Sequence, residues 1–177
     1  MKINENNFIK YLNKGQWKDG WRGGTMDGEG ELIYPKDDKI NRVSYVGNFK
    51  DGRISGKGKI VFKSEDKYEG DFENGLRNGL GVFTFSKGNA EDYYEGHWKD
   101  DKKSGKGKYV WKDGEKYEGE FENNLFNGFG VYTYSKEDDR DYYEGHWKDD
   151  KKSGKGKFVW KNGTKQEGIF ENNSFKH

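Results

Sequence analysis

Residues 67–85 read KYEGDFENGLRNGLGVFTF, and this stretch decides the fold. Tyr68, Gly70 and Phe72 alternate with charged residues, which is the pattern of a strand with one face toward water. Residues 74–78 (NGLRN) supply turn-forming side chains, and glycines and phenylalanines then occupy alternate positions up to residue 85. The stretch therefore predicts a β-hairpin that carries its aromatic rings and glycines on one face.

The same pattern recurs along the chain. Tyr-x-Gly-x-(Phe/Trp) is followed, nine residues after its glycine, by Gly-x-Gly, in units that start at Tyr45, Tyr68, Tyr94, Tyr117 and Tyr143. The lead glycines are 23, 26, 23, 26 and 23 residues apart and end at Gly168. Residues 92–112 and 141–161 differ only at Tyr109 and Phe158, so the duplicated element is a pair of units. A regular period of this length indicates a repeat architecture.

These motifs resemble the MORN (membrane occupation and recognition nexus) repeat, whose pattern is close to YxGxWxxGxxxGxG. The resemblance covers residues 15–175 and divides the chain into an N-terminal cap or tail (1–14) and a repeat array. The array comprises a divergent first unit (15–44) with an insertion at residues 20–24, the five units above, and a half-unit (166–175). Residues 1–14 fit either a short amphipathic helix or a tail without fixed structure.

The expected fold is all-β: an elongated, curled, single-layer antiparallel sheet built from tandem hairpins. Each hairpin alone would be marginally stable, and stacking stabilises the array. A glycine on the aromatic face is expected to let a ring from the neighbouring strand lie flat over the backbone. Residues 168–170 are expected to form a strand without a hairpin partner. Its open edge predicts self-association.

Composition sets further limits. Hydrophobic residues make up 29% of the chain and charged residues 37%, yet aromatic residues reach 17%, which predicts a thin aromatic core rather than disorder. The net charge of +1 argues against a nucleic-acid partner. The chain contains no cysteine, and its first residues contain no apolar run long enough for a signal peptide. We therefore expect a cytoplasmic protein, and the resemblance implies an association with the cytoskeleton or with membranes.

The leading functional hypothesis is a non-catalytic binding scaffold. A single-layer sheet has no second layer over its core, so ring edges should stay open along a concave groove. The resemblance implies that this groove holds an extended or helical segment of a partner protein. For any one ring, packing within the core alone is the competing interpretation. The predicted groove residues are Tyr68, Phe72, Tyr94, Trp98, Tyr117, Phe121, Tyr143, Trp147, Trp111 and Trp160. Leu76, Leu125 and Phe126 are interpreted as exposed apolar turn residues.

The alternative is a peripheral membrane module for anionic phosphoinositide lipids. Its candidate residues are the duplicated lysine turns, Lys102 and Lys103 with Lys151 and Lys152. Asp100–Asp101 and Asp149–Asp150 stand beside them and offset much of their charge, so solvated turns are the competing interpretation.

No catalytic arrangement emerges from the sequence. His97 and His146 occupy equivalent positions of the duplicated units, and no nucleophile or base stands at motif spacing from them. The acidic stretch 137–141 lacks the ligand spacing of an EF-hand loop, which favours a solvated loop. We therefore expect no enzymatic activity, no cofactor and no metal.

Overall fold

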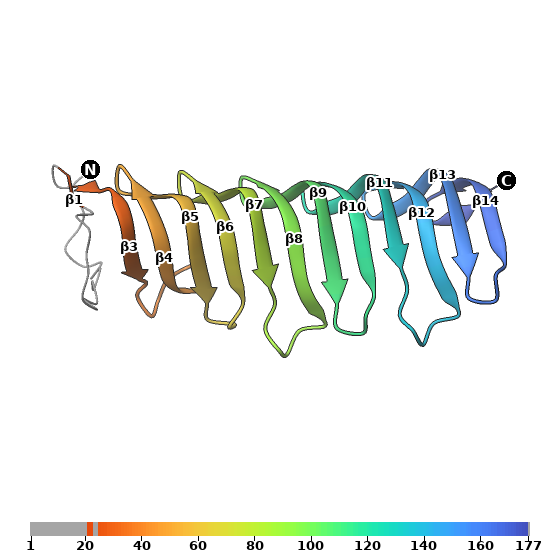
Figure 1. Cartoon of the computed structure of the whole chain (residues 1–177), viewed down its shortest axis with the longest axis horizontal. Helices are drawn as coiled ribbons and strands as arrows, with labels where there is room; N and C mark the ends of the chain where they lie inside the picture. The colour runs from red at the N-terminus through yellow and green to blue at the C-terminus, as the bar shows by residue number, and fades with distance from the viewer. Residues whose placement is uncertain (1–20, 23–24, 177) are drawn as a thin grey trace. The chain divides into compact units, whose positions relative to one another are not determined.

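The computed structural model describes residues 21–22 and 25–176, and every secondary-structure element in these ranges is a β-strand (Figure 1). Within them no helix is long and apolar enough to cross a membrane. The chain divides into two compact units, residues 1–86 and 87–177. In both, consecutive strands pair antiparallel, so the predicted all-β array of tandem hairpins is confirmed. The predicted cap at 1–14 lies outside the described residues.

The first unit contains a short ladder and a run of longer strands. They are β1 (Trp21–Arg22), β2 (Thr25–Met26), β3 (Gly28–Ile33), β4 (Arg42–Lys50), β5 (Arg53–Phe62), β6 (Lys67–Glu73) and β7 (Leu76–Thr84). β1 lies inside the predicted insertion (20–24), whose other residues are not described, and it pairs with β2 directly after that insertion.

The second unit continues the same alternation of strands. It contains β8 (Glu91–Lys99), β9 (Lys102–Trp111), β10 (Lys116–Glu122), β11 (Leu125–Thr133), β12 (Arg140–Lys148), β13 (Lys151–Trp160), β14 (Lys165–Glu171) and β15 (Ser174–Phe175).

Each repeat hairpin turns on two residues that both have positive φ. In the β10–β11 hairpin they are Asn123 (φ 50°) and Asn124 (φ 76°). This backbone belongs to the type I′ turn, whose twist matches that of the flanking strands and which favours Asn, Asp and Gly. The five-residue turn predicted at 74–78 is therefore wrong. Only Asn74 and Gly75 form that turn, and Leu76 already begins β7.

A bulge follows the turn in every hairpin from β4–β5 to β12–β13. In the β10–β11 hairpin Gly119 pairs with Gly130 but Phe121 pairs with Phe126, so residues 127–129 oppose Glu120 alone. Gly128 lies inside this bulge with φ 70°, a conformation that favours glycine. Thus the first glycine of Gly-x-Gly accommodates the bulge. Because the bulge adds two residues, the alternation of faces is preserved across it.

The alternating spacing of the repeats has a structural cause. The connector between β11 and β12 (134–139) has six residues, whereas that between β9 and β10 (112–115) has four. β12 also carries one extra residue, because its pairing with β13 shifts between Arg140 and Tyr142. These two differences add up to the three residues that separate a 26-residue spacing from a 23-residue one.

A ladder of tyrosines forms the core. Tyr45, Tyr68, Tyr94, Tyr117 and Tyr143 are each 0% exposed. The Tyr117 ring meets Phe121 of its own hairpin edge-on at 5.2 Å and Trp147 of the next hairpin at 5.5 Å. Its hydroxyl donates a hydrogen bond to the carbonyl of Glu120 at 3.0 Å. Such edge-to-face pairs add stabilisation beyond area burial and join successive hairpins.

The second glycine of Gly-x-Gly lies under the tyrosine ring. A Cβ atom on Gly130 would lie 2.5 Å from Cζ and 2.6 Å from Cε2 of Tyr117, and Gly81 has the same relation to Tyr68. The expectation that these glycines make room for a ring of the neighbouring strand is confirmed.

The end of the array differs from the prediction. β14 is not a lone strand: it turns at Asn172 and Asn173 into β15, where Phe170 pairs with Phe175. The same pair of asparagines forms the turn of the β10–β11 hairpin. After residue 173, however, no Gly-x-Gly motif follows in the given sequence to mark the second strand. Because β15 has only two residues, it covers only the end of β14, and self-association through this edge stays a prediction.

Candidate partner-binding face

Most of the predicted groove residues lie in the core. The eight residues contributed by first strands are at most 6% exposed: Tyr68, Phe72, Tyr94, Trp98, Tyr117, Phe121, Tyr143 and Trp147. The indole nitrogen of Trp147 donates a hydrogen bond to the carbonyl of Gly130 at 3.2 Å, inside the sheet. These side chains support the aromatic face, and a partner on that face would meet other residues first.

The partly exposed rings come from the second strands. Trp111 and Trp160, both predicted, belong to this layer. Trp111 lies 4.6 Å from Tyr109 and 5.6 Å from Tyr132, and Trp160 lies 4.5 Å from Phe158 (centroid distances). Tyr132, which is also partly exposed, was not among the predicted groove residues. Within the described residues, no second layer covers these rings.

A further column of side chains was missed as a group. We call it the capping column: one residue from each hairpin, two positions after the turn, opposite the Phe or Trp of the first strand. Its members are Ile54 and Arg77 in the first unit, and Lys103, Phe126, Lys152 and Phe175 in the second. Phe126, interpreted as an exposed turn residue, instead stacks on Tyr117 at 3.8 Å. The alternation of strand β11, followed two residues back from Gly128, would have placed it on this face.

The four predicted lipid-binding lysines do not lie together. Lys103 and Lys152 belong to the capping column, whereas Lys102 and Lys151 are exposed neighbours that alternate with them along β9 and β13. The amino group of Lys103 lies 4.2 Å from the Tyr109 ring centroid. Adjacent residues in a strand point to opposite faces, so these lysines form no single basic patch.

Lys152 is held in an aromatic cage. Its amino group lies 4.6 Å from the Phe158 centroid, 5.3 Å from Tyr143 and 5.6 Å from Tyr134, and it donates a hydrogen bond to the Tyr134 hydroxyl at 2.9 Å. Burial, with a smaller contribution from the nearby Arg140 guanidinium, lowers the pKa of Lys152 to about 8. Cation–π attraction partly offsets this loss of hydration.

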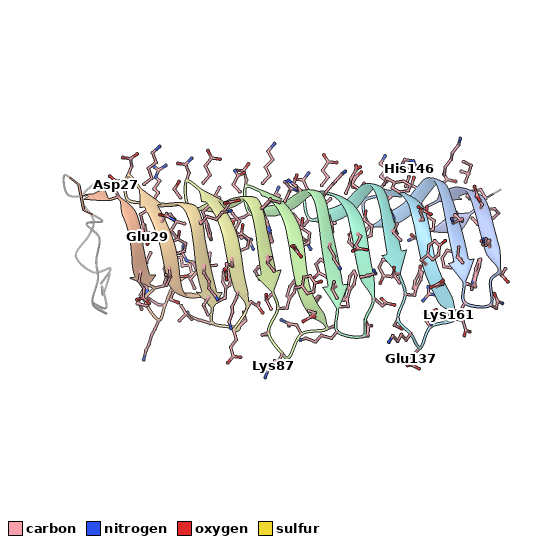
Figure 2. All side chains as sticks on the ribbon, viewed as in Figure 1. Asp27, Glu29, Lys87, Glu137, His146 and Lys161 are labelled. Carbon is pink, nitrogen blue, oxygen red and sulfur yellow. The ribbon has the colours of Figure 1, made fainter. Side chains whose placement is uncertain are left out.

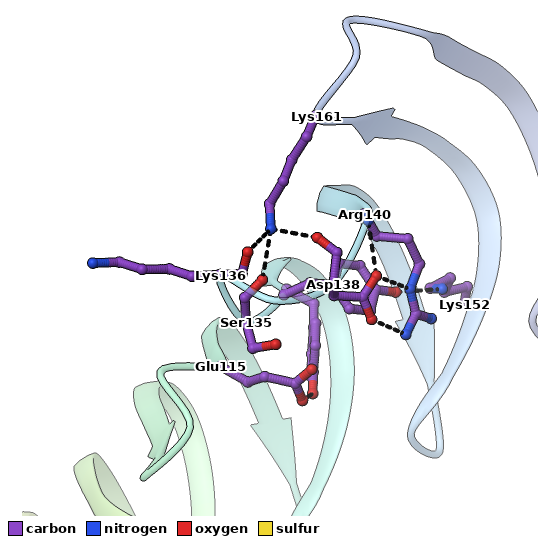
Figure 3. A network of polar contacts seen from close by, with 9 residues as sticks. Glu115, Ser135, Lys136, Asp138, Arg140, Lys152 and Lys161 are labelled. Atoms are coloured by element: carbon purple, nitrogen blue, oxygen red, sulfur yellow. Dashed lines mark hydrogen bonds and ion pairs between the residues drawn. The ribbon is translucent and has the colours of Figure 1, made fainter.

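The connector beside this cage, residues 134–139, is held in place by the Lys161 amino group (Figure 3). Lys161 donates hydrogen bonds to the carbonyls of Ser135 (2.9 Å), Lys136 (2.5 Å) and Asp138, and Asp138 pairs with Arg140 at 2.5 Å. The Arg140 hydrogen bonds lower the pKa of the Asp138 carboxyl. Among the described residues no cluster of three or more His, Asp or Glu could hold a metal ion. At this connector, Lys161 and Arg140 supply the positive charge that a bound cation would otherwise provide.

Lysines one and two paired repeats earlier make the same kind of contact. Lys63 donates to the carbonyl of Lys36 at 2.6 Å, and Lys112 to that of Asn89 at 2.7 Å. Together with Lys161 they stand 49 residues apart. The 49-residue period therefore includes a lysine that holds each long connector in place through hydrogen bonds to backbone carbonyls.

Removing the Lys161 amino group should loosen the connector between β11 and β12 (134–139). We expect Lys161→Met to lower the free energy of unfolding by about 1 kcal/mol, because the three carbonyls exchange a charged donor for water. Hydrogen exchange of the amides in 135–139 should accelerate. Lys148→Met is the control, since Lys148 is exposed and its amino group makes no hydrogen bond or ion pair with the described residues. Equal effects of the two substitutions would contradict the assignment.

The buried tyrosines predict an alkaline limit of stability. Burial raises the pKa of Tyr143 and of Tyr134 to about 12, above the ordinary value of 10. A raised folded-state pKa stabilises the fold below pH 10, and this contribution is lost as pH rises from 10 toward 12, by about 1.4 kcal/mol per pH unit and group. Lys152, with a pKa near 8, titrates in the folded chain before this range. Tyrosinate absorbance and circular dichroism should therefore change together above pH 10. A tyrosinate signal from these residues at pH 10 in a folded chain would contradict this.

The opposite face carries the duplicated histidines and a shallow depression. His146, labelled in Figure 2, meets Phe129 edge-on at 5.6 Å, and Phe129 is 46% exposed. His97 Nδ1 lies 3.1 Å from the carbonyl of Lys106. An open depression of about 660 Å³ is lined by Phe129, His146, Ile169 and the lysines and glutamates between them. Among the described residues, the contacts of His97 and His146 are with the Lys106 carbonyl and the Phe129 ring, and neither pairs with a hydroxyl or carboxylate as a nucleophile–base pair requires.

Comparison with known proteins gives one clear likeness. The MORN repeat family matches residues 14–39, 45–67, 68–90, 94–116, 117–138 and 143–165. No curated protein matches the chain. Among solved structures, the TCP domain of SAS-4 (dCPAP) of Drosophila melanogaster, in complex with a proline-rich motif of Ana2 (dSTIL), is 12% identical. That match covers 81% of this chain and 86% of that one, with a TM-score of 0.36.

Proposed function

Because the chain belongs to the MORN repeat family, we propose that it is a non-catalytic scaffold whose aromatic face holds a segment of a partner protein. MORN repeats are repeat-based binding modules, and the aromatic face is the part of this chain best suited to such a role. One observation carries the proposal. A layer of partly exposed rings, including Trp111 and Trp160, lies over a buried tyrosine ladder, and no other described element covers it.

Rings in this setting suit protein recognition. Tryptophan and tyrosine offer large apolar surfaces with few rotatable bonds, and they are enriched among residues that dominate binding energy. The ladder beneath fixes their positions, so little conformational entropy is lost when a partner binds. The exposed apolar residues of the other face, such as Phe129, are flanked by lysines and glutamates and lack a continuous aromatic support.

The test uses peptides selected from a phage-displayed random library against the full chain. We expect Trp111→Ala and Trp160→Ala to weaken binding of the selected peptides by at least about tenfold, because a buried aromatic anchor contributes more than about 1.4 kcal/mol. Phe129→Ala is the matched control on the opposite face and should leave binding unchanged. Circular dichroism must first establish that each variant is folded. Loss of binding in Phe129→Ala with full binding in both tryptophan variants would contradict the proposal.

Trp98 and Trp147 are unsuitable for this test, although their sequence positions favoured them. Each is 6% exposed, so truncation would report on stability rather than on contact with a partner.

The lipid alternative has weaker support, since its four lysines are divided between two faces. Lys102 and Lys151 are the pair exposed to solvent. Sedimentation with phosphatidylinositol-phosphate vesicles at low and physiological salt tests it: binding lost in Lys102→Gln/Lys151→Gln would favour a membrane role. Absence of binding at both salt concentrations excludes it.

A further inference from the structure

The capping column of the second unit alternates in chemistry. Lys103 on β9 is followed by Phe126 on β11 and Lys152 on β13, each two strands from the last. Since neighbouring strands lie ~4.8 Å apart, each step measures about 10 Å and the two lysines are about 20 Å apart. All three side chains cover a buried tyrosine at the bottom of the aromatic face: Tyr94, Tyr117 and Tyr143. A partner lying along this column meets a cation, a ring and a cation in turn.

Lys152 is a half-buried cation that still lacks an anion. Its partners are three rings and the Tyr134 hydroxyl, and among the described residues no carboxylate forms an ion pair with it. Two acidic groups near Arg140 have other partners: Asp138 pairs with Arg140, and Glu115 accepts a hydrogen bond from the Tyr132 hydroxyl. Figure 3 shows Lys152 and Arg140 side by side. The cage therefore offers a cation without an ion-pair partner in a poorly hydrated setting, where a carboxylate interacts more strongly than in water.

Resting on the proposed function, we infer that the aromatic face binds an acidic partner segment, with two carboxylates about 20 Å apart and an apolar side chain midway between them. An α-helix presents this pattern at positions i, i+7 and i+14, since seven residues rise about 10.5 Å and complete about two turns. A polyproline II helix presents it at i, i+3 and i+6, at about 9.3 Å per step. A β-strand does not, because residues three apart point to opposite sides.

The pKa of Lys152 supports this reading. Burial disfavours its charged form, and an incoming carboxylate would stabilise that form again. Binding of an acidic segment should therefore raise the pKa of Lys152.

The experiment uses two synthetic peptides with blocked ends, an alanine-rich helical one and a proline-rich one. Each carries Glu, Leu and Glu at the spacings above, and each has a matched version with Gln in place of both Glu. Fluorescence anisotropy gives their dissociation constants for the full chain and for Lys103→Gln, Lys152→Gln, Trp160→Ala and the control Lys148→Gln. We expect at least one Glu peptide to bind about tenfold or more tightly than its Gln version. Lys152→Gln should remove most of that difference, Lys103→Gln should reduce it, and Lys148→Gln should leave it intact.

Each outcome decides the inference. If neither Glu peptide binds better than its Gln version, or if Lys148→Gln acts like Lys152→Gln, the acidic partner is overturned. The proposed function would still stand if library-selected peptides depend on Trp111 and Trp160. Conversely, binding that depends on Glu and on Lys152 but is unchanged in Trp160→Ala would support the acidic ligand. It would contradict the proposal that the exposed rings of the aromatic face contact the partner.

Discussion

Gly130→Ala is expected to lower the melting temperature of the chain by roughly 12–24 °C. The added methyl group would lie 2.5 Å from Cζ of Tyr117, well inside van der Waals contact. The ring cannot move away, because Phe121, Phe126 and Trp147 surround it within 5.5 Å between centroids. Overpacking of this kind costs about 3 kcal/mol, and in a unit of this size each kcal/mol shifts the transition by about 4–8 °C.

Gly88→Ala provides the matched control. A Cβ atom there meets no atom within 4 Å, and its backbone needs no positive φ. Thermal unfolding followed by circular dichroism should therefore be nearly unchanged in this variant. Equal melting temperatures for Gly130→Ala and Gly88→Ala would show that the ring does not rest on the glycine.

Tyr117→Ala is expected to lower the free energy of unfolding by about 3–5 kcal/mol, the usual range for truncating a buried aromatic side chain. Tyr117 is 0% exposed and contacts Phe126 of its own hairpin and Trp147 of the next, so its removal leaves a cavity between two hairpins. Tyr117→Phe keeps the ring and loses only the hydrogen bond to the Glu120 carbonyl, which should cost about 1 kcal/mol.

Urea unfolding of the two Tyr117 variants distinguishes a core residue from a binding residue. If Tyr117 contacted a partner directly, the alanine variant would stay as stable as the phenylalanine variant and lose only binding. The large gap expected between them follows from the position of Tyr117 beneath the exposed rings.

Much of this fold could be predicted from the sequence. The alternation around Tyr68, Gly70 and Phe72 identified the hairpin and its aromatic face, because strands have a strict period of two. The spacing of the glycines indicated close approach of ring and backbone, which Gly81 and Gly130 confirm.

The degree to which each side chain of the aromatic face is buried could not be predicted. Alternation assigns a side chain to a face, but burial also depends on which neighbours lie above it. Tyr94 and Trp111 share a face, yet Tyr94 is 0% exposed while Trp111 stays partly open. The difference arises because the glycines beside Tyr94 let its ring sink onto the backbone, where Lys103 and Trp98 then cover it.

The turns hid part of the candidate site. The sequence predicts Leu76 and Phe126 in longer turns, because turn-forming glycine and asparagine residues occur on both sides of them. The actual turn needs only two residues, and the extra glycine serves the bulge. Once the strand is allowed to begin directly after the turn, alternation brings Lys103 and Lys152 onto the aromatic face. Lys103 and Lys152 were predicted to be turn residues because the predicted turns were longer than the actual two-residue turns.

The central claim is that the partly exposed aromatic layer, and not the opposite face, meets the partner. The indole N–H signals of ¹⁵N-labelled protein test it most directly, since Trp111 and Trp160 lie in that layer while Trp98 and Trp147 lie in the core. On addition of a library-selected peptide, we predict large shifts for Trp111 and Trp160 and small ones for amides around Phe129 and Ile169. Shifts concentrated around Phe129 and Ile169, with unchanged Trp111 and Trp160 signals, would contradict the account.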